Sequence, residues 1–218
     1  MNILQSVKFY SPAEERINIA SHALGLALSL VGLALLVVRA NAQGNILHLA
    51  SFAIFGTSLV MLYATSTTYH SARTPAFRHR LRVVDHAMIY VLIAGSYTPI
   101  TLITIGGTTG WLMFGITWGM AFTGIILKLF FTGRYNLLST LMYVFMGWII
   151  VFAIEPLIDN LPAKGLIWLV SSGIAYTLGA LLYAIKKIRF NHAIFHVFVL
   201  LGSACHFVTV YFYVLPRA

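Results

Sequence analysis

The sequence predicts an all-α integral membrane protein: a seven-transmembrane helix bundle built as a single domain over residues 1–218. Three observations predict it. Hydrophobic residues make up 60% of the 218-residue chain and charged residues only 9%, whereas a soluble domain carries about 25% charged residues. The mean hydropathy is +0.88. Seven apolar runs also have the length of a membrane span. Intrinsic disorder is excluded by the apolar composition, and a disulfide scaffold is excluded because Cys205 is the only cysteine.

Each of the seven runs is long enough to cross the hydrocarbon layer as a helix, which takes about 20 apolar residues. A β-barrel would need short strands of alternating apolar and polar residues, and this pattern is absent. The sequence has no internal repeat and no linker long enough to divide it. In order, the runs cover Ile17–Val38, Ile46–His70, Val83–Ile105, Gly110–Phe131, Leu137–Ile154, Gly165–Ile185 and Ala193–Leu215.

Local signals refine some of these elements. Ser11–Glu14 has the pattern of a capping box with proline at the first helical position, which predicts a short surface helix before the first span. Pro99 falls inside the third span and is expected to kink it. Gly115 and Gly119 form a small-xxx-small pair in the fourth span, and we expect them to pack against another helix of the bundle.

The distribution of Lys and Arg predicts the orientation. Seven spans place the two termini on opposite sides, and cytoplasmic loops are enriched in basic residues. A cytoplasmic N-terminus, with the C-terminus outside, puts eleven basic residues on the inner side and three on the outer side. The inner residues are Lys8, Arg16, Arg73, Arg78, Arg80, Arg82, Lys128, Arg134, Lys186, Lys187 and Arg189, and the outer ones are Arg39, Lys164 and Arg217. The expected location is therefore the cell inner (plasma) membrane. The net charge of +9 is explained by topology and requires no nucleic-acid partner.

Asp85 is the acidic residue expected to lie within a span, at the opening of the third one. An acid at the bilayer centre costs about 2.5–3.5 kcal/mol on insertion scales, so an acid inside a span indicates function by default. The alternative is an interfacial carboxylate that pairs with Arg82 or is hydrated among the lipid head groups.

Three histidines are expected at the same depth as Asp85. His192 and His196 lie four residues apart and share one helix face at the opening of the seventh span. His70 ends the second span, with Ser66 on the same face one turn earlier. Because the second span runs inward and the third and seventh begin inside, these residues should meet in one layer near the cytoplasmic face.

Three neutral imidazoles suit a tetrahedral Zn²⁺ site that keeps one position for water, as catalytic zinc sites do. His70, His192 and His196 are the expected ligands, and Asp85 is either the base that binds the water or the fourth ligand. The alternative is a set of interfacial polar residues that bond to one another without a metal.

Further polar residues are expected close to this layer. Glu15, Asn18 and His22 share a face of the first span, where they would either support the metal ligands and line an access path for substrate or join helices by hydrogen bonds. His206 lies ten residues beyond His196, about 15 Å along the helix, so we expect an interhelical hydrogen bond rather than metal ligation.

Taken together, these motifs resemble the progestin and adipoQ receptor superfamily. Glu15-x-x-Asn18-x-x-x-His22, Ser66-x-x-x-His70 followed by Asp85, and His192-x-x-x-His196 followed by His206 match its three motifs. The segments DHAMIYVLIAGSYTP and NHAIFH resemble its bacterial hemolysin III branch, and the likeness extends over nearly the whole chain.

The resemblance implies a seven-helix bundle with a cytoplasmic N-terminus and a zinc ion bound by His70, His192 and His196. It implies that Asp85 holds a zinc-bound water or approaches the metal and that Ser66 lies nearby. The superfamily is similar to alkaline ceramidases, which hydrolyse lipid amides, and bacterial members are linked to membrane-lipid homeostasis. The chain lacks the long N-terminal extension of the eukaryotic receptors, so hormone or adaptor signalling is not expected.

Three functions follow as hypotheses. The first is an intramembrane zinc hydrolase of a lipid amide or ester, such as a ceramide-like substrate, with Asp85 as general base and Ser66 as a hydrogen-bond donor. The second is a non-enzymatic membrane sensor or receptor in which zinc only joins helices. The third, suggested by the family name, is a cytolysin, which ranks last because this chain is built to remain in its own membrane.

Overall fold

The computed structural model describes residues 7–131 and 136–214, and the described chain is almost entirely helical. Seven helices in this part of the protein are long and apolar enough to cross a membrane. Leu215, Arg134 and Arg217, named above at a span end and in the charge distribution, lie outside the described residues. The helical segments are α1 Pro12–Asn41, α2 Ile46–Ser71, α3 Pro75–Pro99, η2 Ile100–Ile105, α4 Gly107–Phe131, α5 Asn136–Trp148, η3 Ile149–Ala153, α6 Ile154–Asn160, α7 Ala163–Ala184, α8 Asn191–Thr209 and η4 Val210–Val214.

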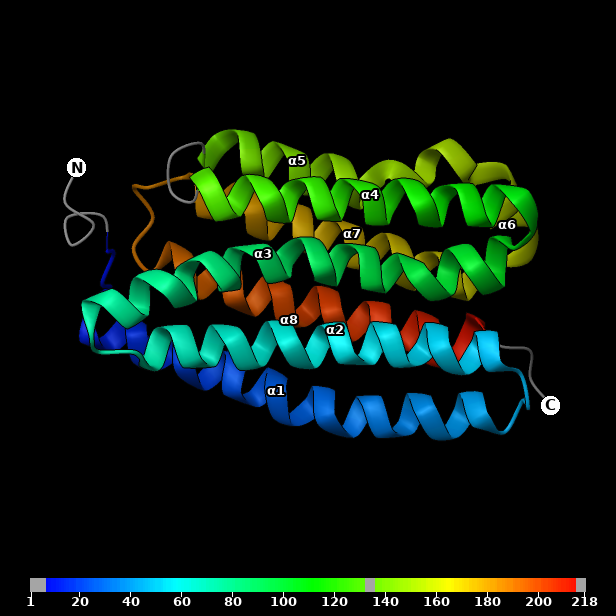
Figure 1. The fold of residues 1–218 in the computed structure, drawn as a ribbon, viewed down its shortest axis with the longest axis horizontal. Helices are drawn as coiled ribbons and strands as arrows, with labels where there is room; N and C mark the ends of the chain where they lie inside the picture. Colours follow the sequence, from blue (N-terminus) through cyan, green and yellow to red (C-terminus); the bar gives the residue numbers. More distant parts are fainter. Residues whose placement is uncertain (1–6, 132–135, 215–218) are drawn as a thin grey trace.

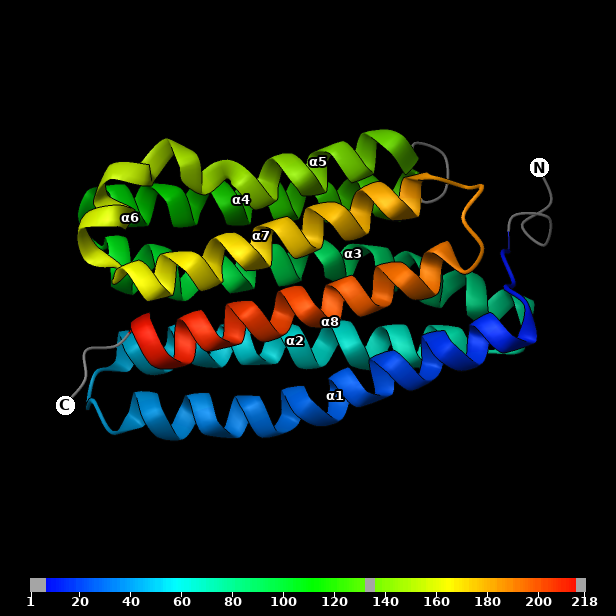
Figure 2. The same cartoon turned by 180° about the vertical axis from the view of Figure 1, so that it is seen from behind.

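The helices form one bundle in which neighbours in the sequence lie side by side (Figures 1 and 2). The helices α1 to α4 follow one another, α5 packs on α7 and α7 on α8. The last helix, α8, returns to pack against α1, which closes the bundle. The beginning of α1, the end of α2 and the beginnings of α3 and α8 therefore lie at one end of the bundle.

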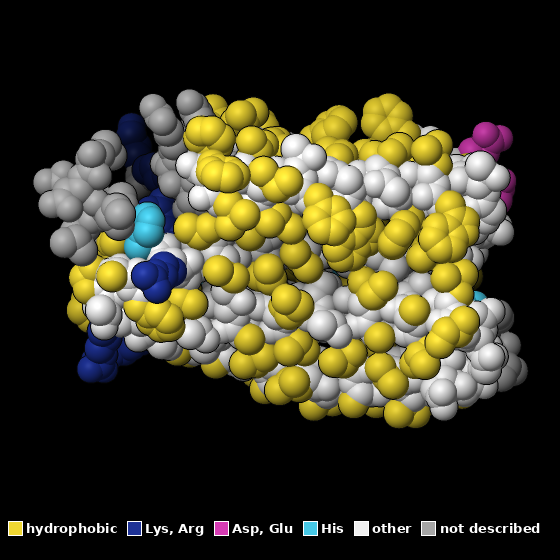
Figure 3. Space-filling view, viewed as in Figure 1, with side chains coloured by type: hydrophobic (Ala, Val, Ile, Leu, Met, Phe, Trp, Pro, Cys, Tyr) yellow, Lys and Arg dark blue, Asp and Glu magenta, His cyan; other side chains and the backbone are white. Residues whose placement is uncertain are grey.

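The outer surface of the bundle is apolar along its length, as a lipid-facing surface must be (Figure 3). Large side chains such as Trp111, Leu112 and Phe122 of α4 are exposed there. In the same view, Lys and Arg side chains gather at the end that holds the N-terminus, and Asp and Glu side chains at the opposite end. The described protein is thus a multi-pass membrane protein in which one end is rich in Lys and Arg.

Two helices begin five or more residues before the apolar runs indicated. Ser11 caps α1 by accepting a hydrogen bond from the Glu14 amide at 3.3 Å. From Pro12 the helix continues without a break into the span, so the short helix expected before Ile17 forms the first turn of α1. The helix α3 begins at Pro75, eight residues before Val83, because its first two turns are polar and basic and hydropathy does not register them. Asp85 therefore lies about three turns inside a helix and does not open it.

The fifth span and the proline of the third show irregular helix. The fifth span changes from α5 to a 3₁₀ segment at Ile149 and continues as α6 to Asn160, six residues past the expected end at Ile154. The α-helical part of the third span ends at Pro99, and a π-helical turn follows. Pro99 lacks an amide hydrogen and disrupts the regular ladder, as expected.

The small-residue pair of α4 does not pack within the bundle as expected. A side-chain carbon added at Gly115 or Gly119 would have no atom of another residue within 4 Å. The glycine that does allow close packing is Gly124, where such a carbon would lie 2.4 Å from the Tyr90 ring of α3. Spacing alone could not distinguish the two, because both lie on the same helix and only the rotation of α4 decides which face meets α3.

Candidate metal centre and cavity

The structure brings three buried imidazoles together at the basic end of the bundle. His70 lies in the last turn of α2, and His192 and His196 lie in the first two turns of α8. The Nε2 atom of His192 is 3.1 Å from Nε2 of His70 and 3.1 Å from Nε2 of His196. The ligand atoms of all three lie within 4.8 Å of one another. Three side chains from two helices thus direct the same kind of nitrogen at one point, and such a group can hold a metal ion.

The donor set fits a divalent cation. With Zn–N bonds of 2.0–2.1 Å, tetrahedral nitrogens lie roughly 3.3 Å apart, close to the observed 3.1 Å. Imidazole suits zinc, copper, iron and nickel, and three protein ligands with one open position are typical of catalytic zinc. Asp85 is not among the residues whose ligand atoms lie within 4.8 Å of one another.

The first helix orients two of the three rings. Oε2 of Glu15 lies 2.7 Å from Nδ1 of His70. The Asn18 amide nitrogen approaches the same atom at 3.4 Å. A ring nitrogen either donates or accepts a hydrogen bond, and the shorter contact indicates that Nδ1 of His70 donates to Glu15. The Nε2 lone pair of His70 can then bind a metal. Carboxylates that accept the other ring N–H commonly fix metal-binding histidines in this way. Nδ1 of His196 lies 3.4 Å from the Asn18 carbonyl oxygen and 3.4 Å from the Ser21 hydroxyl.

His22 lies against the cluster without joining it. Its ring stacks on His196 with a centroid distance of 3.5 Å and an interplanar angle of 11°, and it meets Tyr63 edge-on. Neither ring nitrogen of His22 has a hydrogen-bond partner among the described residues. Glu15 and Asn18 therefore contact the candidate ligands His70 and His196 through polar atoms. His22 contacts His196 only through its ring face.

Asp85 and Ser66 line a cavity that begins at this cluster. The cavity has a volume of about 230 Å³ and also exposes His192 and His196. Ser66 and the His70 imidazole both lie near the Asp85 carboxyl. The neighbouring His86 bonds the Arg82 carbonyl oxygen through Nδ1 at 2.7 Å. Asp85 is thus a carboxyl group near the imidazoles, with the Ser66 hydroxyl and the basic groups of His70, Arg78 and Arg82 around it.

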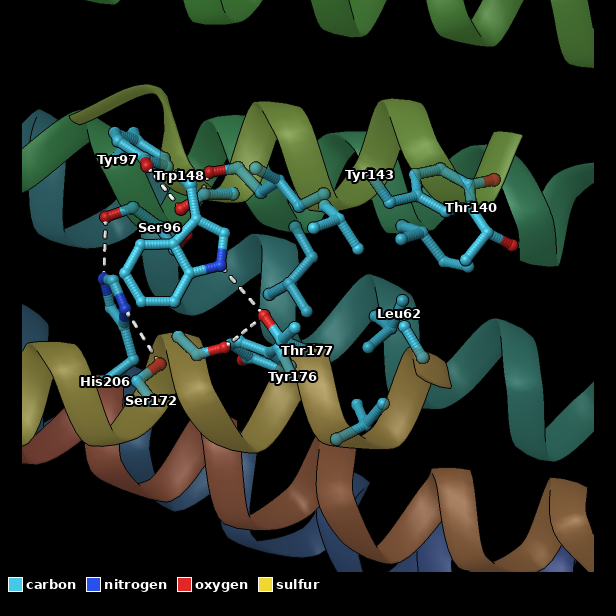
Figure 4. A pocket seen from close by; sticks show the side chains of 18 of the residues that line it. Leu62, Ser96, Tyr97, Thr140, Tyr143, Trp148, Ser172, Tyr176, Thr177 and His206 are labelled. Atoms are coloured by element: carbon cyan, nitrogen blue, oxygen red, sulfur yellow. Dashed lines mark hydrogen bonds between the residues drawn. The ribbon is translucent and has the colours of Figure 1, made fainter. Parts of the chain in front are cut away.

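From there the cavity extends deep into the bundle, to His206. The fourteen residues between His192 and His206 correspond to about 21 Å along α8. Most of the lining is apolar, and Figure 4 shows the polar side chains at the far end. His206 contacts the Ser96 carbonyl oxygen at 3.0 Å and the Ser172 hydroxyl at 3.4 Å, as expected of an interhelical hydrogen bonder. The Trp148 indole donates to Thr177 at 2.9 Å (Figure 4). The shape suits a molecule with a long apolar chain.

Two features of the centre escaped the sequence analysis. Arg78, counted above as a loop charge, is 1% exposed and bonds Glu15. Tyr10, in the segment before α1, stacks on His192 with a centroid distance of 4.6 Å and an interplanar angle of 9°. Burial raises the pKa of the Tyr10 hydroxyl above its usual range and lowers the pKa of the adjacent Lys8 ammonium. No spacing in the sequence distinguishes Arg78 from Arg73, Arg80 and Arg82 nearby, since its role depends on how residues 7–11 fold over the site.

Comparison with known proteins identifies the family of the chain. A family model described as Haemolysin-III related matches residues 10–207. Hemolysin-3 of Bacillus cereus is 44% identical over 205 residues, which cover 94% of each chain. The Hemolysin-3 homolog of Bacillus subtilis (strain 168) is 43% identical over 200 residues, covering 92% of this chain and 94% of the relative. The human monocyte to macrophage differentiation factor is 27% identical over 213 residues, covering 94% of this chain and 87% of the relative. The chain therefore belongs to the haemolysin-III-related family, the hemolysin III branch of the progestin and adipoQ receptor superfamily.

Proposed function

We propose that this protein is a zinc-dependent hydrolase that cleaves an amide or ester bond of a membrane lipid, with a ceramide-like amide as the first candidate substrate. We further propose that its basic end faces the cytoplasm, in keeping with the enrichment of cytoplasmic loops in Lys and Arg. The observation that carries the proposal is the continuity between the three imidazoles, the Asp85 carboxyl and one long apolar cavity. A metal that only stabilised the fold would not require such a cavity.

The side chains around the cluster have chemistry that suits hydrolysis. A cation held by His70, His192 and His196 would supply Lewis-acid chemistry and activate water. The Asp85 carboxylate would accept the proton of the attacking water as general base, and it lies on the cavity wall where the substrate carbonyl would sit. The Ser66 hydroxyl, which lies near Asp85 on the cavity wall, would donate a hydrogen bond to Asp85 or to the developing oxyanion.

The remaining groups would bind and orient. The apolar wall formed by α3, α5, α7 and α8 would take the acyl chain, so the lipid would reach the site from the bilayer. Glu15 would keep the proton of His70 on Nδ1, so that Nε2 stays available for the cation. The Tyr10 ring, stacked on His192, would exclude bulk water from that side.

The test joins metal analysis to lipid turnover. We expect the purified protein to carry about one zinc per chain and to hydrolyse a ceramide-like amide in mixed micelles. Asp85→Asn should keep the metal and lower the rate by about 10²–10⁴-fold, the usual contribution of a general base. His192→Ala should lose both metal and activity. His48→Gln, at the opposite end of α2, is the matched control and should keep both. Turnover that survives unchanged in Asp85→Asn would reject the mechanism.

A second candidate is a membrane sensor in which the metal joins helices without turnover. It is favoured by one observation: the cluster links α2 to α8 directly and to α1 through Glu15 and Asn18. Metal-loaded protein that is stabilised by its metal, but releases no product from lipid amides or esters, would support this candidate over the hydrolase.

A further inference from the structure

Arg78 is almost fully buried, whereas a charged side chain in a loop is normally exposed to water. Its side chain is 1% exposed and lies in the first turn of α3. The terminal nitrogen NH1 donates to the carbonyl oxygens of Tyr69, His70 and Ala72, each at 3.2 Å. The other terminal nitrogen bonds Oε1 of Glu15. Taking a guanidinium out of water is costly unless all its donors are satisfied, and here every nitrogen has a partner.

The three carbonyl groups belong to the end of α2, which carries His70. The last carbonyl groups of a helix have no hydrogen-bond partner within the helix. The planar guanidinium, whose N–H donors are fixed in direction, bonds to all three of these carbonyl oxygens. Its guanidinium carbon lies 4.5 Å from the ring centroid of Phe9 and 4.6 Å from that of Tyr69. Arg78 thus holds the backbone of His70 in place through its carbonyl contacts.

Glu15 connects Arg78 to the side chain of His70. One carboxylate oxygen accepts from Arg78, and the other contacts Nδ1 of His70 at 2.7 Å. With both oxygens engaged, the carboxylate cannot rotate without breaking one of these contacts. Arg78 therefore acts on His70 twice, through the backbone and through the carboxylate that orients its ring.

The N-terminal segment adds a third contact. The Nε atom of Arg78 donates to the Lys8 carbonyl oxygen at 3.0 Å, and the Tyr10 amide donates to Oε1 of Glu15 at 3.1 Å. These two bonds place the Tyr10 ring on His192. A single guanidinium is thereby connected to the surroundings of metal-ligand candidates on both α2 and α8.

We propose that Arg78 is a positioning residue of the metal centre: it holds Glu15, the end of α2 and the Lys8–Tyr10 segment so that His70 and His192 present Nε2 to one cation. The proposal rests on the proposed function only in requiring that the three imidazoles bind a divalent metal. The single ammonium group of lysine cannot make all the hydrogen bonds of the guanidinium, so Arg78→Lys should preserve metal binding only in part.

The test measures metal binding in the full-length protein in detergent micelles, loaded with Co²⁺ so that the visible spectrum reports the coordination geometry. We expect Arg78→Met to weaken Co²⁺ binding about 10–100-fold, the usual effect of losing a group that orients a ligand, and to change the spectrum. Arg78→Lys should fall between this variant and the unchanged protein. Arg80→Met, two residues away on an exposed position of the same helix, is the matched control and should bind as the unchanged protein does.

A variant cycle separates positioning from general loss of structure. Because Arg78 acts in part through Glu15, the double variant Arg78→Met with Glu15→Gln should bind Co²⁺ more tightly than the product of the two single effects predicts, whereas independent effects would multiply. If Arg78→Met does not fold, as judged by circular dichroism and gel filtration, Arg78→Lys and its spectrum decide the question. Wild-type affinity and spectrum in the folded Arg78 variants would overturn the inference and leave the proposed function intact. Failure of the unchanged protein to bind Co²⁺ or Zn²⁺ would overturn both.

Discussion

Removing the metal should lower the thermal stability of the protein by an amount that follows from linkage. The three imidazoles join the end of α2 to the beginning of α8, and such a site does not exist in the unfolded chain. A ligand that binds only the folded state at 100 times its Kd stabilises it by about 2.7 kcal/mol. For a chain of about 150–250 residues, each kcal/mol shifts the Tm by roughly 2–4 °C. The expected drop on metal removal is therefore about 5–11 °C.

The assay is a pair of melting curves in detergent micelles, followed by circular dichroism, on zinc-loaded protein with and without a strong chelator. The His192→Ala variant provides the matched comparison, because it should melt at one temperature under both conditions. His48→Gln, which leaves the cluster intact, should keep the full drop. The reasoning is refuted if chelation leaves the Tm of the zinc-loaded protein unchanged, or if His192→Ala shows the same drop as the unchanged protein.

Two further predictions concern the bundle away from the metal. Gly124→Leu should cost about 1–3 kcal/mol of stability, because an added side-chain carbon would lie 2.4 Å from the Tyr90 ring. Gly115→Leu, where the space is open, should change stability by less than about 0.5 kcal/mol, and equal melting of the two variants would contradict this packing. His206→Ala should cost about 1–3 kcal/mol by removing the partner of the Ser96 carbonyl. Metal content should stay at one ion per chain, and its loss would show that the two ends of the cavity are coupled.

The seven spans and the depth of the histidines were predictable because both follow from quantities that a sequence contains. Run length and composition identify a span, and the alternating direction of successive spans sets the end at which His70, His192 and His196 lie. The beginning of α3 was not predicted because its first residues are not apolar. Residues 75–82 are polar and basic, so a hydropathy criterion excludes them although they are helical. Pro75, at the first helical position, was the one available signal.

The surroundings of the site depend on contacts that spacing does not encode. Periodicity places residues on a face of their own helix, but how each helix is rotated in the bundle is decided by packing against its neighbours. Gly115 and Gly124 of α4 illustrate this: the first was expected inside the bundle and the second is the one that packs there. Arg78 and Tyr10 show the same limit, since their roles arise from an irregular segment that folds over the ends of α2 and α8.

The arrangement of ligands in the chain has a consequence for biosynthesis. His196, the last of the three, follows His70 by 126 residues, so at about 5–20 residues per second the ribosome takes roughly 6–25 s to synthesise the stretch between them. Early hairpins of the nascent chain can insert and pair in order, but capture of the cation must await the final helix. Binding of the proposed cation would thus be a late step of maturation, and a chain truncated before that helix would lack two of the three imidazoles.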